Sequence, residues 1–162
     1  MNTQAWPALR ELDRAECEAL LARNQVGRIA FSFRDHVDIQ PMHYAYADGW
    51  IYGRTSPGSK LTTLAHHRWV AFEVDEVEGA FDWRSVVAHG AVYIITPDSA
   101  HAQHAPRALA LLRGVIPETF TERDPVPFRD VLLGIHVDAL RGRVASTAGG
   151  RREATVAANA SG

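Results

Sequence analysis

The sequence predicts a mainly β fold, in which six antiparallel strands close into a barrel flanked by a few short helices. Apolar and polar residues alternate at period two over much of the chain, which is typical of half-buried strands. Short polar turns join several of these runs, so we expect consecutive strands to pair antiparallel. A parallel nucleotide-binding sheet is disfavoured, because the first strand runs straight into a hairpin and carries no glycine fingerprint.

The first expected element is a helix that begins after Asp13 and ends at Asn24. Asp13 is followed three residues later by Glu16, which is a capping-box pattern, and apolar residues continue at helical spacing. We interpret Cys17 as a small residue on the helix face rather than as a nucleophile. Residues 1–12 are expected to be a leader that lies over the surface.

Strands are expected over residues 26–33, 37–46 and 50–55, joined by polar turns. In the second of these strands the apolar residues change phase at Gln40-Pro41, from Val37 and Ile39 to Met42. A β-bulge at the proline would explain the change, and bulges are common beside functional sites.

The rest of the domain is expected to contain a helix over 59–66 and strands over 69–74, 83–96 and 131–139. Gly90 predicts a kink where the sheet curls, and the acidic residues 75–78 predict a solvated turn. A helical region follows Pro97, and the segment 117–127 is irregular. Residues 1–146 are therefore expected to form a single domain, and the tail 147–162 is expected to be disordered.

Composition excludes several classes of function. The net charge of −2 argues against nucleic-acid binding, because there is no basic excess to neutralise phosphates. The single cysteine excludes an internal disulfide, and the histidines show no metal-ligand spacing. No apolar run is long enough to cross a membrane, and the N-terminus lacks the regions of a signal peptide. We therefore expect a cytoplasmic protein without a metal site.

The stretch from Trp50 to Ala65 carries the strongest functional signal. A β-prone run ends in Arg54-Thr55, a Pro-Gly turn follows, and Ser59 is expected to be the N-cap of a helix that continues with Lys60. Free amides, the positive end of a helix dipole, hydroxyls and two cations favour an anion, and we expect a phosphate monoester. After Gly58 the order is Ser59-Lys60, the reverse of the Lys-Ser/Thr order of a P-loop, which disfavours binding of a nucleoside triphosphate. The alternative is a capped surface helix after a turn.

Five short motifs also occur in one order along the chain. They are Val26-Gly27-Arg28-Ile29-Ala30, Pro41-Met42-His43-Tyr44, Ile51-Tyr52-Gly53-Arg54-Thr55 with Gly58-Ser59-Lys60, Val70-Ala71-Phe72-Glu73-Val74-Asp75, and Trp83-Arg84-Ser85-Val86-Val87 with Gly90. In this order the chain resembles the pyridoxamine 5′-phosphate oxidase-like flavoproteins, and within them the branch that includes the nitroimidazole-resistance proteins. The resemblance covers about residues 9–96 and a final strand ending at Arg143. It implies a six-stranded antiparallel split β-barrel of Greek-key type, and a homodimer with FMN bound at the subunit interface.

The resemblance also implies roles for individual residues. The FMN phosphate would be held by Arg54, Thr55, Ser59 and Lys60. The isoalloxazine ring would be lined by the backbone of Gln40, Pro41, Met42 and His43. The partner subunit would contribute Trp83, Ser85 and Val86, although Arg84 interrupts the family's Trp-Ser-Val motif.

His43 is the candidate catalytic residue, as a proton donor near neutral pH, and the alternative is a strand histidine bonded to a neighbour or to solvent. The leading hypothesis is an FMN-dependent oxidoreductase that acts on a small molecule. The alternatives are a deazaflavin-dependent reductase, or a non-catalytic redox sensor or carrier that binds flavin or haem. A true pyridoxine-phosphate oxidase is disfavoured, because the sequence shows no second phosphate site and no C-terminal Arg-x-His signature.

Overall fold

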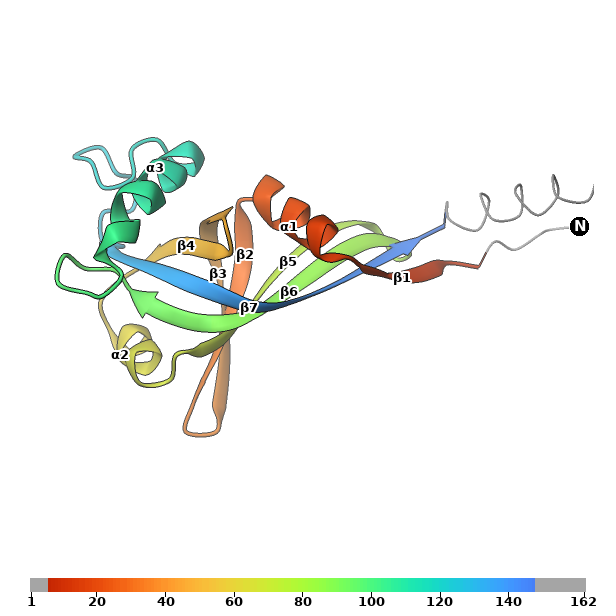
Figure 1. The fold of residues 1–162 in the computed structure, drawn as a ribbon, viewed down its shortest axis with the longest axis horizontal. Coiled ribbons are helices and arrows are strands. Elements are labelled where there is room, and N and C mark those ends of the chain that lie inside the picture. The colour runs from red at the N-terminus through yellow and green to blue at the C-terminus, as the bar shows by residue number, and fades with distance from the viewer. Residues whose placement is uncertain (1–5, 148–162) are drawn as a thin grey trace, which may run out of the picture.

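The computed structural model describes residues 6–147, and its strands form one antiparallel sheet in the order β1-β7-β4-β3-β2-β5-β6. An additional pairing of β6 with β7 closes six of the seven strands into a ring (Figure 1). The strands are β1 (Ala8–Leu12), β2 (Val26–Phe33), β3 (His36–Ala47), β4 (Trp50–Thr55), β5 (Trp69–Gly79), β6 (Asp82–Ile94) and β7 (Val131–Ser146). The helices are α1 (Arg14–Arg23), α2 (Ser59–His66), the short η1 (Ala102–His104) and α3 (Ala105–Val115).

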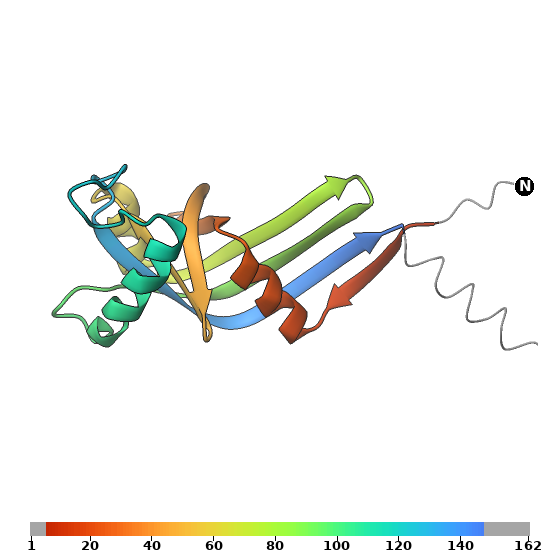
Figure 2. The same cartoon turned by 90° about the horizontal axis from the view of Figure 1, so that it is seen from above.

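The predicted mainly β split barrel is confirmed, and the six expected strands are the six that form the ring. The seventh strand, β1, corrects the prediction that residues 1–12 are a leader. It pairs antiparallel with the end of β7, from Ala8↔Ser146 to Leu12↔Gly142, along the edge of β7 that β4 does not reach (Figure 2). Its side chains are almost all exposed, so the sequence lacks the alternation that reveals a half-buried strand. The predicted tail lies outside the described residues apart from Thr147.

The core lies inside the ring and is closed by α1. Asp13 and Glu16 form the expected capping box, and Cys17 is buried on the inner side of the helix with Leu20 and Leu21. These three residues pack in one cluster with inward-facing residues of the strands. A smaller cluster lies between α3 and the strands β3 and β4. Among the described residues, no helix combines the length and the apolar character needed to cross a membrane.

The prediction of a β-bulge at Gln40-Pro41 is wrong. The strand β3 pairs with β2 in one register, from Val26↔His43 to Phe33↔His36. Met42 shares its inward phase with Gln40, while Val37 and Ile39 are exposed on the other face of the sheet. The apparent change of phase therefore reflects exposed apolar residues, not an inserted residue.

Two further predictions concern β5 and β6. The acidic residues 75–78 lie within β5, which is longer than expected, and Glu76 is bonded to Arg23 of α1. Gly90 does mark an irregularity: the pairing of β6 with β7 shifts register between His89 and Gly90. A Cβ atom at Gly90 would lie 2.0 Å from the carbonyl oxygen of His136, so the close approach of the two strands requires glycine.

Candidate anion-binding site

A cavity of about 250 Å³ opens where β3, the end of β4 and the start of α2 meet. Seven of the predicted site residues line it, although they come from two separate stretches of the chain. The lining consists of Gln40, Pro41, Met42, Arg54, Thr55, Ser56, Pro57, Gly58, Ser59, Lys60 and Arg129. The structure therefore joins the segment expected to meet a flavin ring with the segment expected to hold a phosphate.

The first turn of α2 contributes backbone donors to this cavity. The helix begins after Gly58, whose φ of 146° suits glycine, and the expected N-cap Ser59 is instead the first helical residue. The amide of Thr62 donates to the carbonyl of Gly58, at 3.1 Å, so the three amides before it precede the first helical bond. Among the described residues no side chain caps them. Together with the helix dipole they favour an anion at this end.

Lys60 brings a positive charge to the same place. Its side chain is partly buried, and its Nζ lies 5.8 Å from the centre of the Phe31 ring. Burial lowers the pKa of Lys60, the nearby charge of Arg129 lowers it further, and Asp38 opposes the change. The site thus holds a partly desolvated cation, which a bound anion would stabilise.

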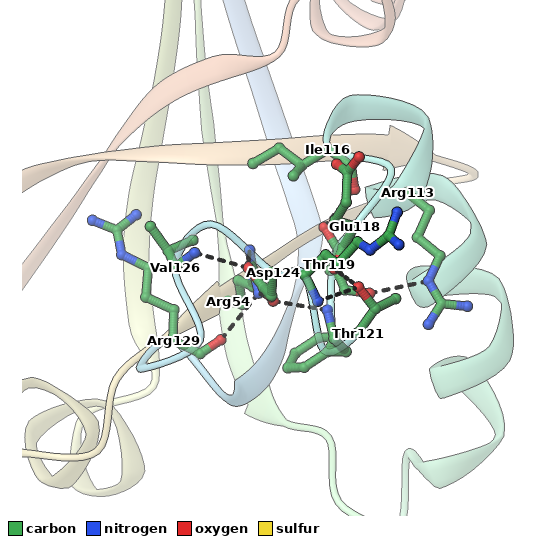
Figure 3. Close-up of polar contacts among 11 residues, drawn as sticks. Arg54, Arg113, Ile116, Glu118, Thr119, Thr121, Asp124, Val126 and Arg129 are labelled. Carbon is green, nitrogen blue, oxygen red and sulfur yellow. Dashed lines mark hydrogen bonds and ion pairs between the residues drawn. The ribbon is translucent and has the colours of Figure 1, made fainter.

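Arg54 lines the cavity, but its charge is paired with another residue. Its guanidinium donates two hydrogen bonds to the carboxylate of Asp124, one of them 2.8 Å long (Figure 3). The two side chains are only 6% and 3% exposed. The hydrogen bond from Arg54 holds the pKa of Asp124 well below its usual range, so the pair stays ionised. Of the two cations predicted to hold a phosphate, only Lys60 has a charge left for it.

Sequence reasoning missed Asp124 and Arg129. Both lie in the irregular segment between α3 and β7, where no periodicity or motif distinguishes them from other charged residues. An acidic residue directly before Pro125 reads as an ordinary turn residue. Their role depends on how this segment folds back onto β4, about which local sequence carries no information.

Four predicted site residues do not line the cavity. Val86 is fully buried in the core, and His43 is exposed on the face opposite Met42. Trp83 lines a different hollow, of about 330 Å³, together with residues of β1 and with Arg143. Ser85 lies on the same strand as Trp83 and pairs with Arg143 of β7. Within one chain the structure does not bring these residues to the other seven.

His43, Trp83 and Ser85 share one surface, which we call the outer sheet face. Alternation along the strands places their side chains opposite the core-facing residues. Cross-strand registers join this face across β3, β2, β5 and β6, for example along Pro41↔Arg28↔Glu73↔Val87. The outer sheet face also carries apolar side chains that are largely exposed, namely Val37 (78%), Ile39 (61%) and Trp69 (69%).

Comparison with known proteins places this arrangement in a family. The family model described as pyridoxamine 5′-phosphate oxidase matches residues 13–144. A FAD-binding protein from Mesorhizobium loti has a similar structure, with a TM-score of 0.69 and 26% identity over 85% of this chain and 98% of that one. A protein from Bacteroides thetaiotaomicron, proposed to act in 5-nitroimidazole antibiotic resistance, aligns with a TM-score of 0.61 over 85% of this chain and 89% of its own, at 17% identity. That second likeness shows a common fold.

A curated relative from Rhizobium meliloti is 28% identical over 82 residues, which are 51% of this chain. The aligned part spans about half of that relative, 54% of its length, and its name, an uncharacterized protein, states no function. The family match covers most of the chain, including α1, the ring up to residue 144 and the segment that carries Asp124 and Arg129. The chain therefore belongs to the pyridoxamine 5′-phosphate oxidase-like family of split β-barrel proteins.

Proposed function

We propose that the protein binds a flavin whose phosphate lies in the cavity at the start of α2, and that it uses this flavin as a redox cofactor. The observation that carries the proposal is the junction of the Gln40–Met42 strand segment with Thr55, Lys60 and the free amides of α2 in one cavity. Hydroxyls, amides and a cation are the donors that phosphate groups prefer. The FAD-binding protein from Mesorhizobium loti, which shares this fold, supports a flavin as the ligand.

Among flavins we propose FMN. The donors come from β4, α2 and the segment before β7, and they line a small, half-open cavity of about 250 Å³. A terminal phosphate monoester presents three oxygen atoms to these donors. The inner phosphate of a dinucleotide presents fewer, and it needs an open path for the adenosine.

The backbone of β3 is available to the flavin ring without a bulge. In the described sheet, β4 pairs with β3 only from Tyr44↔Gly53 to Ala47↔Trp50, whereas β2 pairs with β3 back to His36. The edge of β3 at Gln40 to Met42 that faces away from β2 therefore borders the cavity instead of another strand. Its amide and carbonyl groups can bind the polar edge of the ring.

When bound, a flavin supplies hydride and electron transfer, and the protein supplies position and electrostatics. We propose an FMN-dependent oxidoreductase that acts on a small molecule. His43, which faces away from the cavity of its own chain, would act as the proton donor at a flavin bound between two subunits. Anaerobic reoxidation of the reduced flavin by candidate small-molecule acceptors tests this step, because a protein without a substrate pocket would give no rate above that of free reduced FMN. The His43→Gln variant should lower that rate and leave FMN affinity unchanged.

We further propose that the site is completed in a homodimer. His43, Trp83 and Ser85 lie on the outer sheet face, away from the cavity of their own chain, and that face exposes Val37 and Ile39. A second copy seated on the outer sheet face would cover these apolar residues and could bring its Trp83 to the flavin ring.

The experiment that tests the proposed function is identification of the bound cofactor, followed by titration with FMN and with riboflavin. Absorbance and mass of the copurified cofactor distinguish FMN from FAD, deazaflavin and haem. Lys60→Ala should weaken FMN binding about 10- to 100-fold, the loss of one charge-assisted hydrogen bond, and leave riboflavin unaffected. Arg34→Ala, which removes an exposed cation at the β2–β3 turn, is the matched control. Equal affinity of the wild-type protein for FMN and riboflavin would contradict a phosphate cradle.

A further inference from the structure

We infer that Arg129 is the second cation of the phosphate cradle, and that the buried pair of Arg54 and Asp124 serves to position it. This inference rests on the proposed function, since it assigns residues to the same site. It also reverses the role that the sequence suggested for Arg54, from phosphate ligand to positioning residue.

Arg129 has the placement that a phosphate ligand needs. Arg129 lines the cavity with Lys60, and it is partly buried. Within residues 6–147 no carboxylate lies within ion-pair distance of its guanidinium, in contrast to Arg54. Lys60 and Arg129 line the same cavity, and the charge of Arg129 adds to burial in lowering the pKa of Lys60. A dianionic phosphate between them would offset both positive charges.

The segment that carries Arg129 is fixed to the barrel through Asp124. The carboxylate of Asp124 accepts hydrogen bonds from Arg54 and from the amides of Phe120, at 2.8 Å, and Val126, at 2.9 Å (Figure 3). Arg54 also approaches the carbonyl of Arg129, at 3.5 Å, and its guanidinium lies 5.2 Å from the centre of the Phe120 ring. One strand residue thus contacts the irregular segment at three points.

A second anchor holds the start of the same segment to α3. Arg113 donates to the carbonyl of Thr119 at 3.0 Å, and the buried hydroxyl of Thr119 donates to the carbonyl of Ile116 at 2.7 Å. With both anchors in place, the backbone at Arg129 is held at the rim of the cavity. Preorganisation of this kind reduces the entropy that phosphate binding would otherwise cost.

The two possible roles of Arg54 predict effects of opposite sign for Asp124→Asn. If Arg54 bound phosphate itself, loss of the competing carboxylate charge would free its guanidinium and strengthen FMN binding. If the pair positions Arg129, the same variant loosens the segment and weakens FMN binding. The sign of the change therefore decides between them.

The experiment titrates the full-length chain and its variants with FMN and with riboflavin. Arg129→Ala should weaken FMN about 10- to 100-fold without changing riboflavin affinity or thermal stability, and Arg129→Lys should restore part of the loss. Arg123→Ala, on the same segment but outside the cavity lining, is the matched control and should bind FMN like the wild type. Asp124→Asn should weaken FMN in the wild-type background and add little to Arg129→Ala, because residues that act through one another are not additive.

Tighter FMN binding by Asp124→Asn, or unchanged binding by Arg129→Ala, would overturn the inference. If Asp124→Asn does not fold, the Arg129 variants still decide, since that side chain is not part of the buried pair. Failure of the proposed function has a different signature: the wild-type protein itself would bind FMN no better than riboflavin.

Discussion

At the scale of single residues, burial separates side chains that hold the fold from those free to bind a ligand. Arg54 and Lys60 are both cations beside the cavity, yet Arg54 is neutralised by a buried carboxylate and Lys60 is not. Breaking a buried ion pair leaves an uncompensated charge, so loss of either partner is strongly destabilising. Residue type alone therefore assigns no role to either cation.

Tyr44 shows the structural side of the same distinction. Its ring is fully buried against Phe72, with centroids 4.9 Å apart, and its hydroxyl donates to the carbonyl of Leu21 at 2.6 Å. Tyr44→Phe should lower the free energy of unfolding by about 1–2 kcal/mol, because that carbonyl in the last turn of α1 loses its buried donor. Urea unfolding measures the change.

Tyr46→Phe is the matched control for Tyr44→Phe. Tyr46 is only half-buried, and its hydroxyl reaches the partly exposed Glu18 at 3.2 Å. Water can replace that bond, so we expect a change below about 0.5 kcal/mol. Equal losses in the two variants would show that the Leu21 contact contributes nothing specific.

At the scale of elements, the contact between β6 and β7 depends on Gly90. Gly90→Ala places a methyl group 2.0 Å from a backbone oxygen of β7, and a backbone cannot move aside as a side chain can. We expect a loss of about 3 kcal/mol or more, at the upper end of overpacking effects. Gly114→Ala is the control of opposite sign: that glycine lies in α3 with open space around it, and alanine should stabilise the helix by about 0.5–1 kcal/mol. Thermal unfolding compares the two variants.

The attachment of α1 to β5 makes stability dependent on acid pH. Glu76 accepts hydrogen bonds from Arg23 and Asn24, and the bond from Arg23 is the main cause that lowers its pKa to about 2. Because the folded pKa lies below the unfolded value of about 4.3, the stabilisation is complete above that value and is lost as the pH falls towards 2. Exposure to solvent limits the contribution to about 1 kcal/mol.

Glu76→Gln should therefore lower the free energy of unfolding at pH 7 by the contribution of this ion pair. The variant should also lose less stability than the wild type between pH 5 and 2, by roughly a similar amount. Urea titrations at several pH values measure both effects. Glu78→Gln, on the exposed end of the same strand, serves as the control. If the stability of Glu76→Gln depended on pH as that of the wild type does, this ion pair would not couple α1 to the sheet.

At the scale of the whole molecule, the outer sheet face exposes the apolar side chains of Val37, Ile39 and Trp69. If a second copy covers it, charges placed there should separate the subunits, since buried unpaired charges are costly at interfaces. We expect the double variant Val37→Asp with Ile39→Asp to be monomeric by light scattering and to bind FMN more weakly than the wild type. Ala22→Asp, on the exposed side of α1, should leave both properties unchanged. A wild-type monomer with full FMN affinity would contradict the proposed homodimer.

Much of the ring could be predicted from the sequence, because side-chain alternation and capping are local. The period-two runs located the six ring strands, Asp13 and Glu16 marked the start of α1, and Gly90 marked the irregularity in β6. The same locality explains the errors. Exposed β1 has no alternation of apolar and polar residues. The exposed apolar residues Val37 and Ile39 suggested a bulge, which the continuous register of β2 with β3 excludes.

The sequence by itself determined the donor set of the site, since Thr55, Lys60 and the start of α2 follow one another within a few residues. Only the tertiary structure decided which of its charges are free. Asp124 lies 70 residues from Arg54, and the irregular segment that carries Asp124 and Arg129 has no local pattern. Its fold depends on the buried bonds between Asp124 and Arg54 of β4, and no local pattern can predict a contact between residues so far apart in the sequence.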